Sequence, residues 1–334
     1  MKEIKWGIIG CGNVTEIKSG PAFNKVGHSE LIAVMRRNIA LAEDYARRHH
    51  VPKFYGDADL LINDTDVNAV YVATPPDTHA EYAIKAIKAG KPVYVEKPMA
   101  RNYAECREMI RVSEETGQAL YVAYYRRTLP AFLKIKELIE QGAIGNVLTV
   151  NIRLHKAFGE RDRHPEKQDW HVAPEIAGAG HFYDLASHQF DYLDFLLGPV
   201  KQVSGIASNI AGYYRAEDTV SAVFSFESGI LGNGSWCFVV DKENEEDSIE
   251  ISGTEGRIRF SCFDKRDVEL ITAKGIKTFA FQNHENISFY LVQQVTGALR
   301  GENECVSTMY SAARTNFVME EIVKTYYSGK TDTI

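Results

Sequence analysis

The feature that most constrains the fold is an alternation of short β-rich runs with amphipathic helical stretches over roughly the first 120 residues. Helical patterns such as residues 79–89 and 104–116 separate the runs. Repeated βαβ units build a parallel sheet with helices packed on its faces. We therefore predict a doubly wound α/β Rossmann domain over residues 1–123. Its expected strands are residues 4–9, 30–35, 69–73, 92–96 and 119–123.

The pattern changes after residue 123. A predicted helix, 130–141, precedes a predicted strand, 147–154, in which apolar side chains alternate with polar ones. Such alternation is typical of an antiparallel sheet with one covered face. We expect residues 124–334 to form an α+β domain with a largely antiparallel, open-faced sheet. Its other expected elements are two strands within 219–240, a solvated loop at 241–247, strands near 249–260 and 268–281, and a helix near 307–327.

Length and charge narrow the class of protein. At 334 residues the chain is long enough for two domains. Its net charge is −7 and its Lys and Arg residues are dispersed, so neither nucleic acid nor an anionic membrane is an expected partner. The first apolar run follows directly after Met1-Lys2-Glu3, and no apolar stretch reaches membrane-spanning length. We expect neither a signal peptide nor a membrane anchor.

The five cysteines are scattered and form no CxxC pair. This spacing argues against a zinc site and against a disulfide framework. We therefore expect no bound metal and a reducing, cytoplasmic compartment.

A glycine loop follows the first predicted strand. Its sequence is Gly10-Cys11-Gly12-Asn13-Val14-Thr15, so two glycines stand where a Rossmann turn bends tightly and approaches a pyrophosphate. The third position of that fingerprint is Thr15 instead of a small residue. The alternative is a simple strand-to-helix turn. Because the loop lies directly after the first strand of a βαβ pattern, we predict that Gly10, Gly12, Asn13 and Val14 contact a dinucleotide.

Two arginines, Arg36 and Arg37, end the second predicted strand. A carboxylate at this position would bind the adenosine ribose of NAD. A guanidinium can instead form paired hydrogen bonds with a 2′-phosphate. The residues favour NADP over NAD, and the alternative is that both are ordinary surface arginines.

Lys97 lies in the sequence Glu96-Lys97-Pro98, at the carboxyl end of a predicted parallel strand. Open α/β sheets bind their ligands at this edge. Proline disfavours the helical region for the residue before it, which keeps Lys97 extended near the expected crevice. Alone, Lys97 could equally be an exposed lysine in a βα loop.

A second cluster lies at residues 178–188, where a glycine-containing loop enters a predicted helix. Asp184 and His188 are four residues apart and share one face of this helix. Such a pair could orient and deprotonate an alcohol, because histidine titrates near neutral pH. The alternative is a surface ion pair.

Taken together, these motifs resemble the Gfo/Idh/MocA oxidoreductases, a family that includes glucose-fructose oxidoreductase and inositol dehydrogenases. The resemblance covers nearly the whole chain. It rests on the glycine loop, Ala73-Thr74-Pro75-Pro76 with His79, Glu96-Lys97-Pro98, Arg127-Thr128-Leu129-Pro130, Trp170-His171 and the segment 178–188.

The resemblance implies roles for these residues. Thr74, Pro75, His79 and Glu96 would contact the nicotinamide half of the cofactor. His188 would exchange a proton with the reacting hydroxyl, Lys97 would polarise that hydroxyl, and Asp184 would orient the histidine and the substrate. Tyr124, Arg127, Trp170 and His171 would line the substrate pocket. The resemblance also implies a homodimer or homotetramer formed through the open sheet of the C-terminal domain.

The chain departs from the family pattern at Thr15, at Ala179 and at His171, where many members have arginine. The last departure leaves the identity of the substrate open. The leading hypothesis is hydride transfer between NADP(H) and a secondary alcohol or carbonyl of a sugar, cyclitol or related diol. One alternative is an enzyme that retains its nicotinamide while cleaving a glycosidic bond. The other is a sensor without catalysis, against which Lys97, Asp184 and His188 argue.

Overall fold

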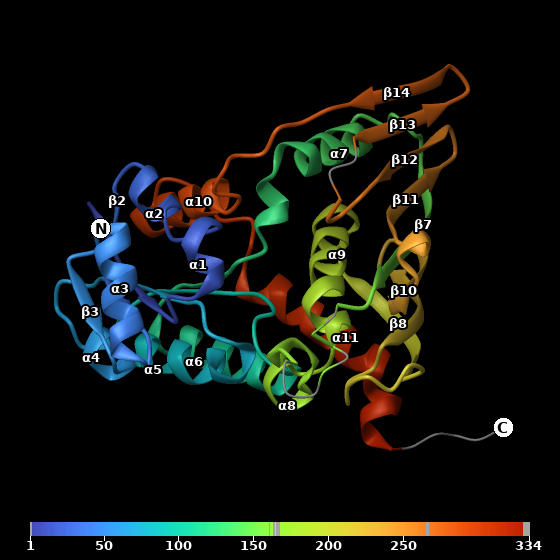
Figure 1. Ribbon diagram of the computed structural model, residues 1–334. Coiled ribbons are helices and arrows are strands. Elements are labelled where there is room, and N and C mark those ends of the chain that lie inside the picture. Colours follow the sequence, from blue (N-terminus) through green and yellow to red (C-terminus); the bar gives the residue numbers. More distant parts are fainter. Residues whose placement is uncertain (1, 160, 163, 165–167, 265–266, 330–334) are drawn as a thin grey trace. The chain divides into compact units, whose positions relative to one another are not determined.

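The computed structural model describes residues 2–159, 161–162, 164, 168–264 and 267–329 (Figure 1). The chain forms two compact units. Unit 1 comprises Met1–Thr128 and Asn283–Ala313, and unit 2 comprises Leu129–Gln282 and Arg314–Ile334. The predicted division at residue 123 assigned everything after it to the second domain, whereas residues 283–313 belong to unit 1. The reason is apolar packing, because α10 (Phe289–Arg300) buries Leu291, Val292 and Val295 in the same core cluster as the first strand.

Unit 1 contains a six-stranded sheet in the order β3-β2-β1-β4-β5-β6. All of its pairings are parallel, which is the classical Rossmann arrangement. The doubly wound fold predicted from the sequence is therefore confirmed. The strands are β1 (Ile4–Ile9), β2 (Ser29–Met35), β3 (Lys53–Tyr55), β4 (Ala69–Val72), β5 (Val93–Val95) and β6 (Leu120–Val122).

Helices cover both faces of this sheet, and alternating strand residues enter two separate cores. Val70, Val72, Val93 and Val95 pack against α4, α5 and α6 on one face. Trp6, Tyr71 and Tyr94 belong to the core on the other face, which includes α2, α3 and α10. The helices of unit 1 besides α10 are α1 (Asn13–Ile17), α2 (Ala22–Lys25), α3 (Ile39–His49), α4 (Ala58–Ile62), α5 (His79–Lys88) and α6 (Tyr103–Thr116).

Unit 2 contains an eight-stranded sheet in the order β14-β13-β12-β11-β7-β10-β9-β8. Only the central β7–β10 pairing is parallel, so the predicted, largely antiparallel sheet is confirmed. The strands are β7 (Val147–Ala157), β8 (Val200–Ser208), β9 (Thr219–Phe226), β10 (Leu231–Val240), β11 (Glu246–Gly253), β12 (Gly256–Phe260), β13 (Val268–Thr272) and β14 (Gly275–Phe279).

One face of the second sheet packs against helices. Phe190 of α9 (His181–Leu197) contacts the rings of Phe224 and Trp236, and Tyr192 contacts Phe260. The other helices of unit 2 are α7 (Pro130–Glu140), α8 (Pro174–Ala177) and most of α11 (Met309–Ser328).

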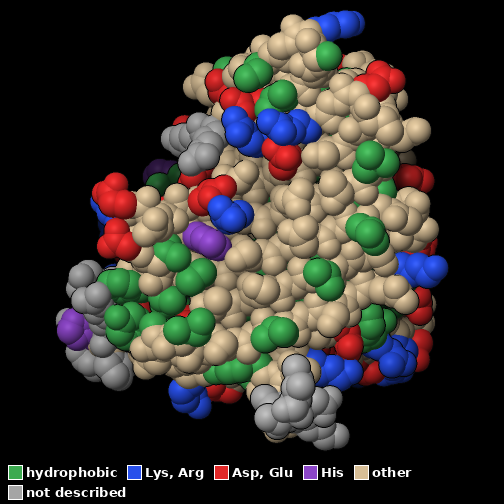
Figure 2. Space-filling model, turned by 90° about the vertical axis from the view of Figure 1, so that its right-hand side faces the viewer, with side chains coloured by type: hydrophobic (Ala, Val, Ile, Leu, Met, Phe, Trp, Pro, Cys, Tyr) green, Lys and Arg blue, Asp and Glu red, His purple; other side chains and the backbone are tan. Residues whose placement is uncertain are grey.

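The other face of this sheet carries exposed residues. Ile206, Val223 and Leu231 are 77%, 60% and 61% exposed. Figure 2 shows this side of the molecule, where scattered hydrophobic side chains lie among uncharged surface and most charged side chains lie toward the edges.

The acidic stretch 241–247 is a loop only in its first part, which corrects the prediction of a fully solvated loop. Glu246 and Asp247 already belong to β11, and Asp247 is buried. Its carboxylate accepts hydrogen bonds from the backbone N–H groups of Cys262, Phe263 and Asp264. A buried carboxylate is stable where N–H donors converge on it, and here it organises the turn after β12.

Within the described part of the chain, no helix is both long and apolar enough to cross a bilayer. All five cysteines are free thiols.

Candidate active site

The glycine loop lies at the carboxyl end of β1. Gly10 has φ of 92°, and a Cβ atom there would lie 2.7 Å from Cγ2 of Thr74, so this position requires glycine. A Cβ atom at Gly12 would meet only the carbonyl oxygen of Gly10, at 3.8 Å. The space beside Gly12 is therefore open, as a backbone that approaches a pyrophosphate needs. Asn13 and Val14 follow at the start of α1, where backbone N–H groups favour anions.

Thr15 occupies the third fingerprint position without disturbing the turn. Its side chain is buried, and its hydroxyl donates to the carbonyl oxygen of Gly12 at 2.8 Å. The hydroxyl of Tyr45 on α3 donates to the carbonyl oxygen of Thr15, also at 2.8 Å. The larger side chain of Thr15 is thus accommodated by one hydrogen bond within the turn, and a second hydrogen bond joins α1 to α3.

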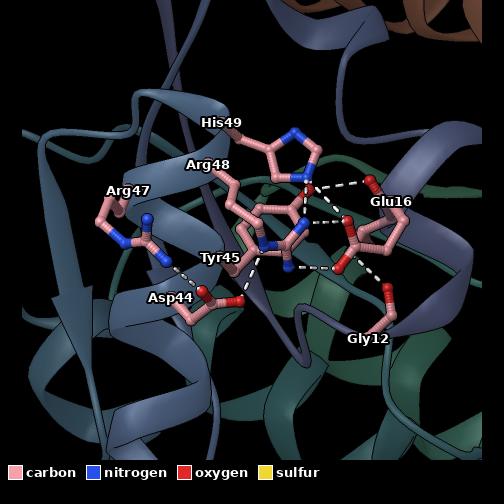
Figure 3. Close-up of polar contacts among 8 residues, drawn as sticks. Gly12, Glu16, Asp44, Tyr45, Arg47, Arg48 and His49 are labelled. Carbon is pink, nitrogen blue, oxygen red and sulfur yellow. Dashed lines mark hydrogen bonds and ion pairs between the residues drawn. The ribbon is translucent and has the colours of Figure 1, made fainter.

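An ion cluster strengthens the same junction (Figure 3). Arg48 donates two hydrogen bonds of 2.7 Å to the Glu16 carboxylate and one of 2.7 Å to Asp44. His49 lies 2.8 Å from Glu16, and Arg47 lies 2.6 Å from Asp44. The Arg48 guanidinium beside Glu16 lowers the pKa of that carboxyl to about 2. Both arginines of the cluster are therefore electrostatically compensated.

Arg36 and Arg37 differ from Arg47 and Arg48 in their ion pairing. They follow β2 directly, and both are exposed. Among the residues that the structure describes, no carboxylate forms an ion pair with either guanidinium. Two exposed guanidinium groups thus lie at the carboxyl end of β2.

His79 joins the loops that follow β4 and β5. Its ring is completely buried, with Nδ1 3.0 Å from the carbonyl oxygen of Pro98 and Nε2 2.7 Å from that of Thr74. Burial lowers the pKa of His79. Thr74 also accepts a hydrogen bond from the hydroxyl of Thr78 at 2.8 Å, and Pro75 precedes a short 3₁₀ turn. The histidine fixes the two loops that carry Thr74, Pro75 and Lys97.

Glu96 and Lys97 lie at the carboxyl end of β5. Glu96 is buried, accepts a hydrogen bond from the hydroxyl of Tyr71, and accepts a second from the backbone N–H of Lys97 at 3.1 Å. Burial raises the pKa of Glu96. Lys97 is half-buried, and its peptide bond to Pro98 is cis.

Tyr124 and Arg127 follow β6 and are both buried in unit 1. The guanidinium of Arg127 donates to the carbonyl oxygen of Val306 at 2.9 Å. Arg127 thereby holds the segment that connects α10 to α11, and its substrate contact stays a prediction.

In unit 2, α9 places Asp184 and His188 one turn apart. Asp184 is half-buried and His188 is buried. The His188 ring contacts the ring of Phe263 edge-on, with centroids 5.9 Å apart. Phe263 lies in the turn that the buried carboxylate of Asp247 holds. The turn that follows β12 therefore packs against His188, and the action of Asp184 and His188 as a pair stays a prediction.

Trp170 and His171 form the short 3₁₀ helix η4 (Trp170–Val172) and stack with ring centroids 3.7 Å apart. His171 Nδ1 lies 3.4 Å from the carboxylate of Asp169. The contact of Trp170 and His171 with a substrate stays a prediction.

Two acidic residues near the start of α9 were missed by the sequence analysis. Asp162 is largely buried, and its carboxylate lies 3.4 Å from Nε2 of His181. Glu217 is completely buried and accepts hydrogen bonds from the backbone N–H of Gly180. In the sequence, Glu217 is marked only by its position two residues before the alternating strand that begins at Thr219.

The described residues include no group of three or more His, Cys, Asp or Glu side chains that could hold a metal ion.

The fold and these residues define a class of protein, and comparison with known families identifies it. Residues 4–124 match the model described as an oxidoreductase family with an NAD-binding Rossmann fold. Residues 132–259 match the GFO/IDH/MocA C-terminal domain. The chain belongs to the GFO/IDH/MocA oxidoreductase family and is an enzyme of the NAD(P)-dependent dehydrogenase and reductase class.

The chain is also similar to individual proteins that have names. It is 35% identical to Oxidoreductase P35 of Formosa agariphila, over 95% of this chain and 97% of the relative. It is 29% identical to the 1,5-anhydro-D-fructose reductase of Ensifer adhaerens, over 76% of this chain and 74% of the relative. A levoglucosan dehydrogenase structure in complex with NADH and levoglucosan superposes with a TM-score of 0.87 at 23% identity, covering 98% of both chains. This last likeness establishes the fold.

Proposed function

We propose that the protein transfers a hydride between NADP(H) and a secondary alcohol or carbonyl of a sugar, cyclitol or related diol. The observation that carries the proposal is the Asp184–His188 pair, which lies one turn apart on α9 in a chain whose other unit has a dinucleotide-binding turn. The relative named as a 1,5-anhydro-D-fructose reductase supports this substrate class.

Each residue of the proposed catalytic set has a distinct task. His188 accepts the proton of the substrate hydroxyl, and Asp184 orients the histidine and a neighbouring hydroxyl. The Lys97 ammonium stabilises the negative charge that develops on the reacting oxygen. The nicotinamide, when bound, supplies or accepts the hydride. Trp170 and His171 contact the substrate ring, as do Tyr124 and Arg127.

The proposed cofactor site lies at the carboxyl ends of the parallel strands in unit 1. Gly10, Gly12, Asn13 and Val14 hold the pyrophosphate, and the exposed Arg36 and Arg37 bind a 2′-phosphate. This charge distribution supports NADP over NAD, because Arg47 and Arg48 are already paired with carboxylates, whereas within the described ranges Arg36 and Arg37 are not. Thr74, Pro75, Glu96 and Lys97 lie along the nicotinamide half, and His79 positions their loops.

We also propose a homo-oligomer that forms through the open face of the second sheet. A hollow of about 630 Å³ lies at the β8 edge of this sheet. Val223 and Leu231 of its lining belong to the open face, Phe317 belongs to α11, and the charged residues Lys201 and Glu321 also line it. Apolar side chains on a surface with few charges are typical of an interface core. The free cysteines support a reducing compartment such as the cytoplasm.

Absorbance at 340 nm tests the proposed reaction. The purified protein is mixed with NADP or NAD and a panel of sugars, inositols, anhydro-ketoses and diols, and both directions are followed. We expect substrate-dependent formation or consumption of reduced cofactor, faster with the phosphorylated form. Tight cofactor binding with no change in absorbance for any substrate would instead favour an enzyme that retains its nicotinamide, or a sensor.

A further inference from the structure

The buried carboxylate of Glu217 lies at the beginning of α9. Its two oxygens are 3.0 and 3.2 Å from the backbone nitrogen of Gly180, the residue that caps this helix. The hydroxyl of Tyr327, near the end of α11, donates to Oε2. Glu217 itself precedes β9. One side chain therefore joins three segments that are distant in the sequence.

The approach of these segments is close. A Cβ atom at Gly180 would lie 2.8 Å from Cβ of Ala216 and 2.8 Å from the carbonyl oxygen of Glu217. The backbone before β9 thus packs directly against the helix cap. A carboxylate at a helix N-terminus also interacts favourably with the partial positive charge there. These contacts fix where α9 begins.

Asp184 and His188 lie one and two turns after this point on the same helix. A shift of the first turn therefore moves Asp184 directly, and His188 through the helix backbone. Catalytic geometry is sensitive to such shifts, since a misplacement of about 1 Å can cost roughly 100-fold in rate.

On the basis of the proposed function, we infer that Glu217 is a positioning residue for the reaction, because its carboxylate holds the first turn of α9 and thereby the side chains of Asp184 and His188. Nothing in the mechanism above uses Glu217 directly. Its role depends on the carboxylate form, since both oxygens accept in that form, whereas protonation turns one of them into a donor and removes the charge.

The surroundings of Glu217 make its charge sensitive to pH. Burial raises the pKa of Glu217 to about 7, and the hydrogen bonds from Tyr327 and Gly180 oppose that rise. The other titratable groups that face it are His181 of α9, Tyr326 of α11 and Tyr214. The carboxylate form is therefore present above about pH 7 and is lost as the pH falls below it.

The conservative substitution Glu217→Gln tests the inference. It keeps the volume but places an N–H₂ donor where the donors of Gly180 and Tyr327 converge. The full-length variant, the wild type and Glu227→Gln are compared. Glu227 is a suitable control because it is an exposed glutamate ten positions further on.

We expect Glu217→Gln to bind NADPH as the wild type does and to lower kcat roughly 10-fold, with a smaller change in KM. Its kcat profile should keep the inflection due to His188 but lose the additional dependence near pH 7 that Glu217 contributes in the wild type, and Tyr327→Phe should move that additional dependence to higher pH. Glu227→Gln should change none of these values. A folded Glu217→Gln variant with wild-type kcat and an unchanged pH profile would overturn the inference.

Hydrogen–deuterium exchange of residues 178–188 at pH 8 is a second test of the positioning role, and it needs no substrate. We expect faster exchange in Glu217→Gln and in Glu217→Ala than in the wild type or Glu227→Gln. Unchanged exchange in both Glu217 variants would contradict the positioning role. If the wild type turns over no polyol but the exchange changes as expected, the proposed function fails while the positioning of α9 stands.

Discussion

At the scale of single residues, four arginines of one βα unit show how context decides the role of a charge. Arg47 and Arg48 are held by Asp44 and Glu16, whereas Arg36 and Arg37 project from the end of β2 without a carboxylate partner among the described residues. A guanidinium that already forms an ion pair with a carboxylate binds a phosphate less strongly than one that does not. Under the proposed function, cofactor choice depends on Arg36 and Arg37.

Arg36→Asp should weaken NADPH binding roughly 10- to 100-fold, because it removes a charge-assisted hydrogen bond and adds a repulsive charge. NADH binding should change little. Fluorescence titration of both cofactors measures the effect, with Arg47→Asp as the control, since that exposed arginine is paired with Asp44. Equal losses of NADPH and NADH affinity in Arg36→Asp would refute the phosphate-binding role.

His188→Ala should lower kcat by roughly 100-fold or more, as expected when a general base is removed. Its affinity for the cofactor should stay close to that of the wild type. Steady-state kinetics and cofactor titration separate the two effects, and the neutral control is His28→Ala on the surface of unit 1. A His188→Ala variant with wild-type kcat would exclude this histidine as the base.

The sequence predicted the position of the site residues better than their surroundings. Gly10, Lys97, Asp184 and His188 stand where strand ends and helix spacing placed them. The sequence could not show that both ring nitrogens of His79 meet backbone carbonyls, or that Arg127 is buried against Val306. Such contacts join segments up to 179 residues apart. Local patterns carry no information about them.

At the scale of elements, the junction of α1 and α3 shows how a short helix is held in place. A five-residue helix is too short to be stable alone. Glu16 of α1 binds Arg48 and His49 of α3, and Tyr45 of α3 binds the backbone of Thr15 (Figure 3). The helix that follows the glycine loop is thereby fixed from its neighbour.

Glu16→Gln should destabilise the protein by about 1 kcal/mol at pH 7, a value that allows for the partial exposure of the pair. The pKa of Glu16 is lowered from 4.5 to about 2, so its stabilisation is present above pH 4.5 and is lost as the pH falls toward 2. Denaturant unfolding at pH 7 and near pH 2.5 tests this, with Glu43→Gln as an exposed control on α3. The same destabilisation at both pH values would show that the charge of Glu16 is not responsible.

Long, strongly patterned elements were predicted from the sequence, and short or polar ones were missed. β1 and α6 agree with the expected ranges to within a residue or two, and α9 begins within the segment 178–188 where a helix was expected. β3 has three residues, none of them buried, and β8 is an edge strand without a buried residue. Apolar periodicity reports burial, so a strand with little burial gives little signal.

At the scale of the whole molecule, each of the two units consists of two separate segments of the chain. Residues 283–313 add α10 to unit 1 after the second sheet is complete. The helix packs three apolar side chains into the core behind Trp6 and Tyr71. A linear reading of the sequence assigns such a segment to the preceding domain because only its packing partners reveal the return.

Val223→Asp should disrupt the proposed oligomer, because it places a charge on the open face of the second sheet, on the strand next to its β8 edge. Light scattering coupled to size-exclusion chromatography measures the mass. Leu60→Asp is the matched control, since Leu60 is equally exposed at 60% but lies on α4 of unit 1. A wild-type protein that is monomeric at micromolar concentration, or a Val223→Asp variant with an unchanged oligomer, would count against this interface.

The most direct test of the central claim is label transfer from substrate to cofactor. A polyol that gives turnover is prepared with deuterium on the reacting carbon and is incubated with NADP⁺, and the reduced cofactor is examined by mass spectrometry. Hydride transfer predicts one deuterium in each NADPH formed, and none when unlabelled polyol reacts in D₂O. Deuterium that appears in the solvent instead of in the NADPH would contradict direct hydride transfer.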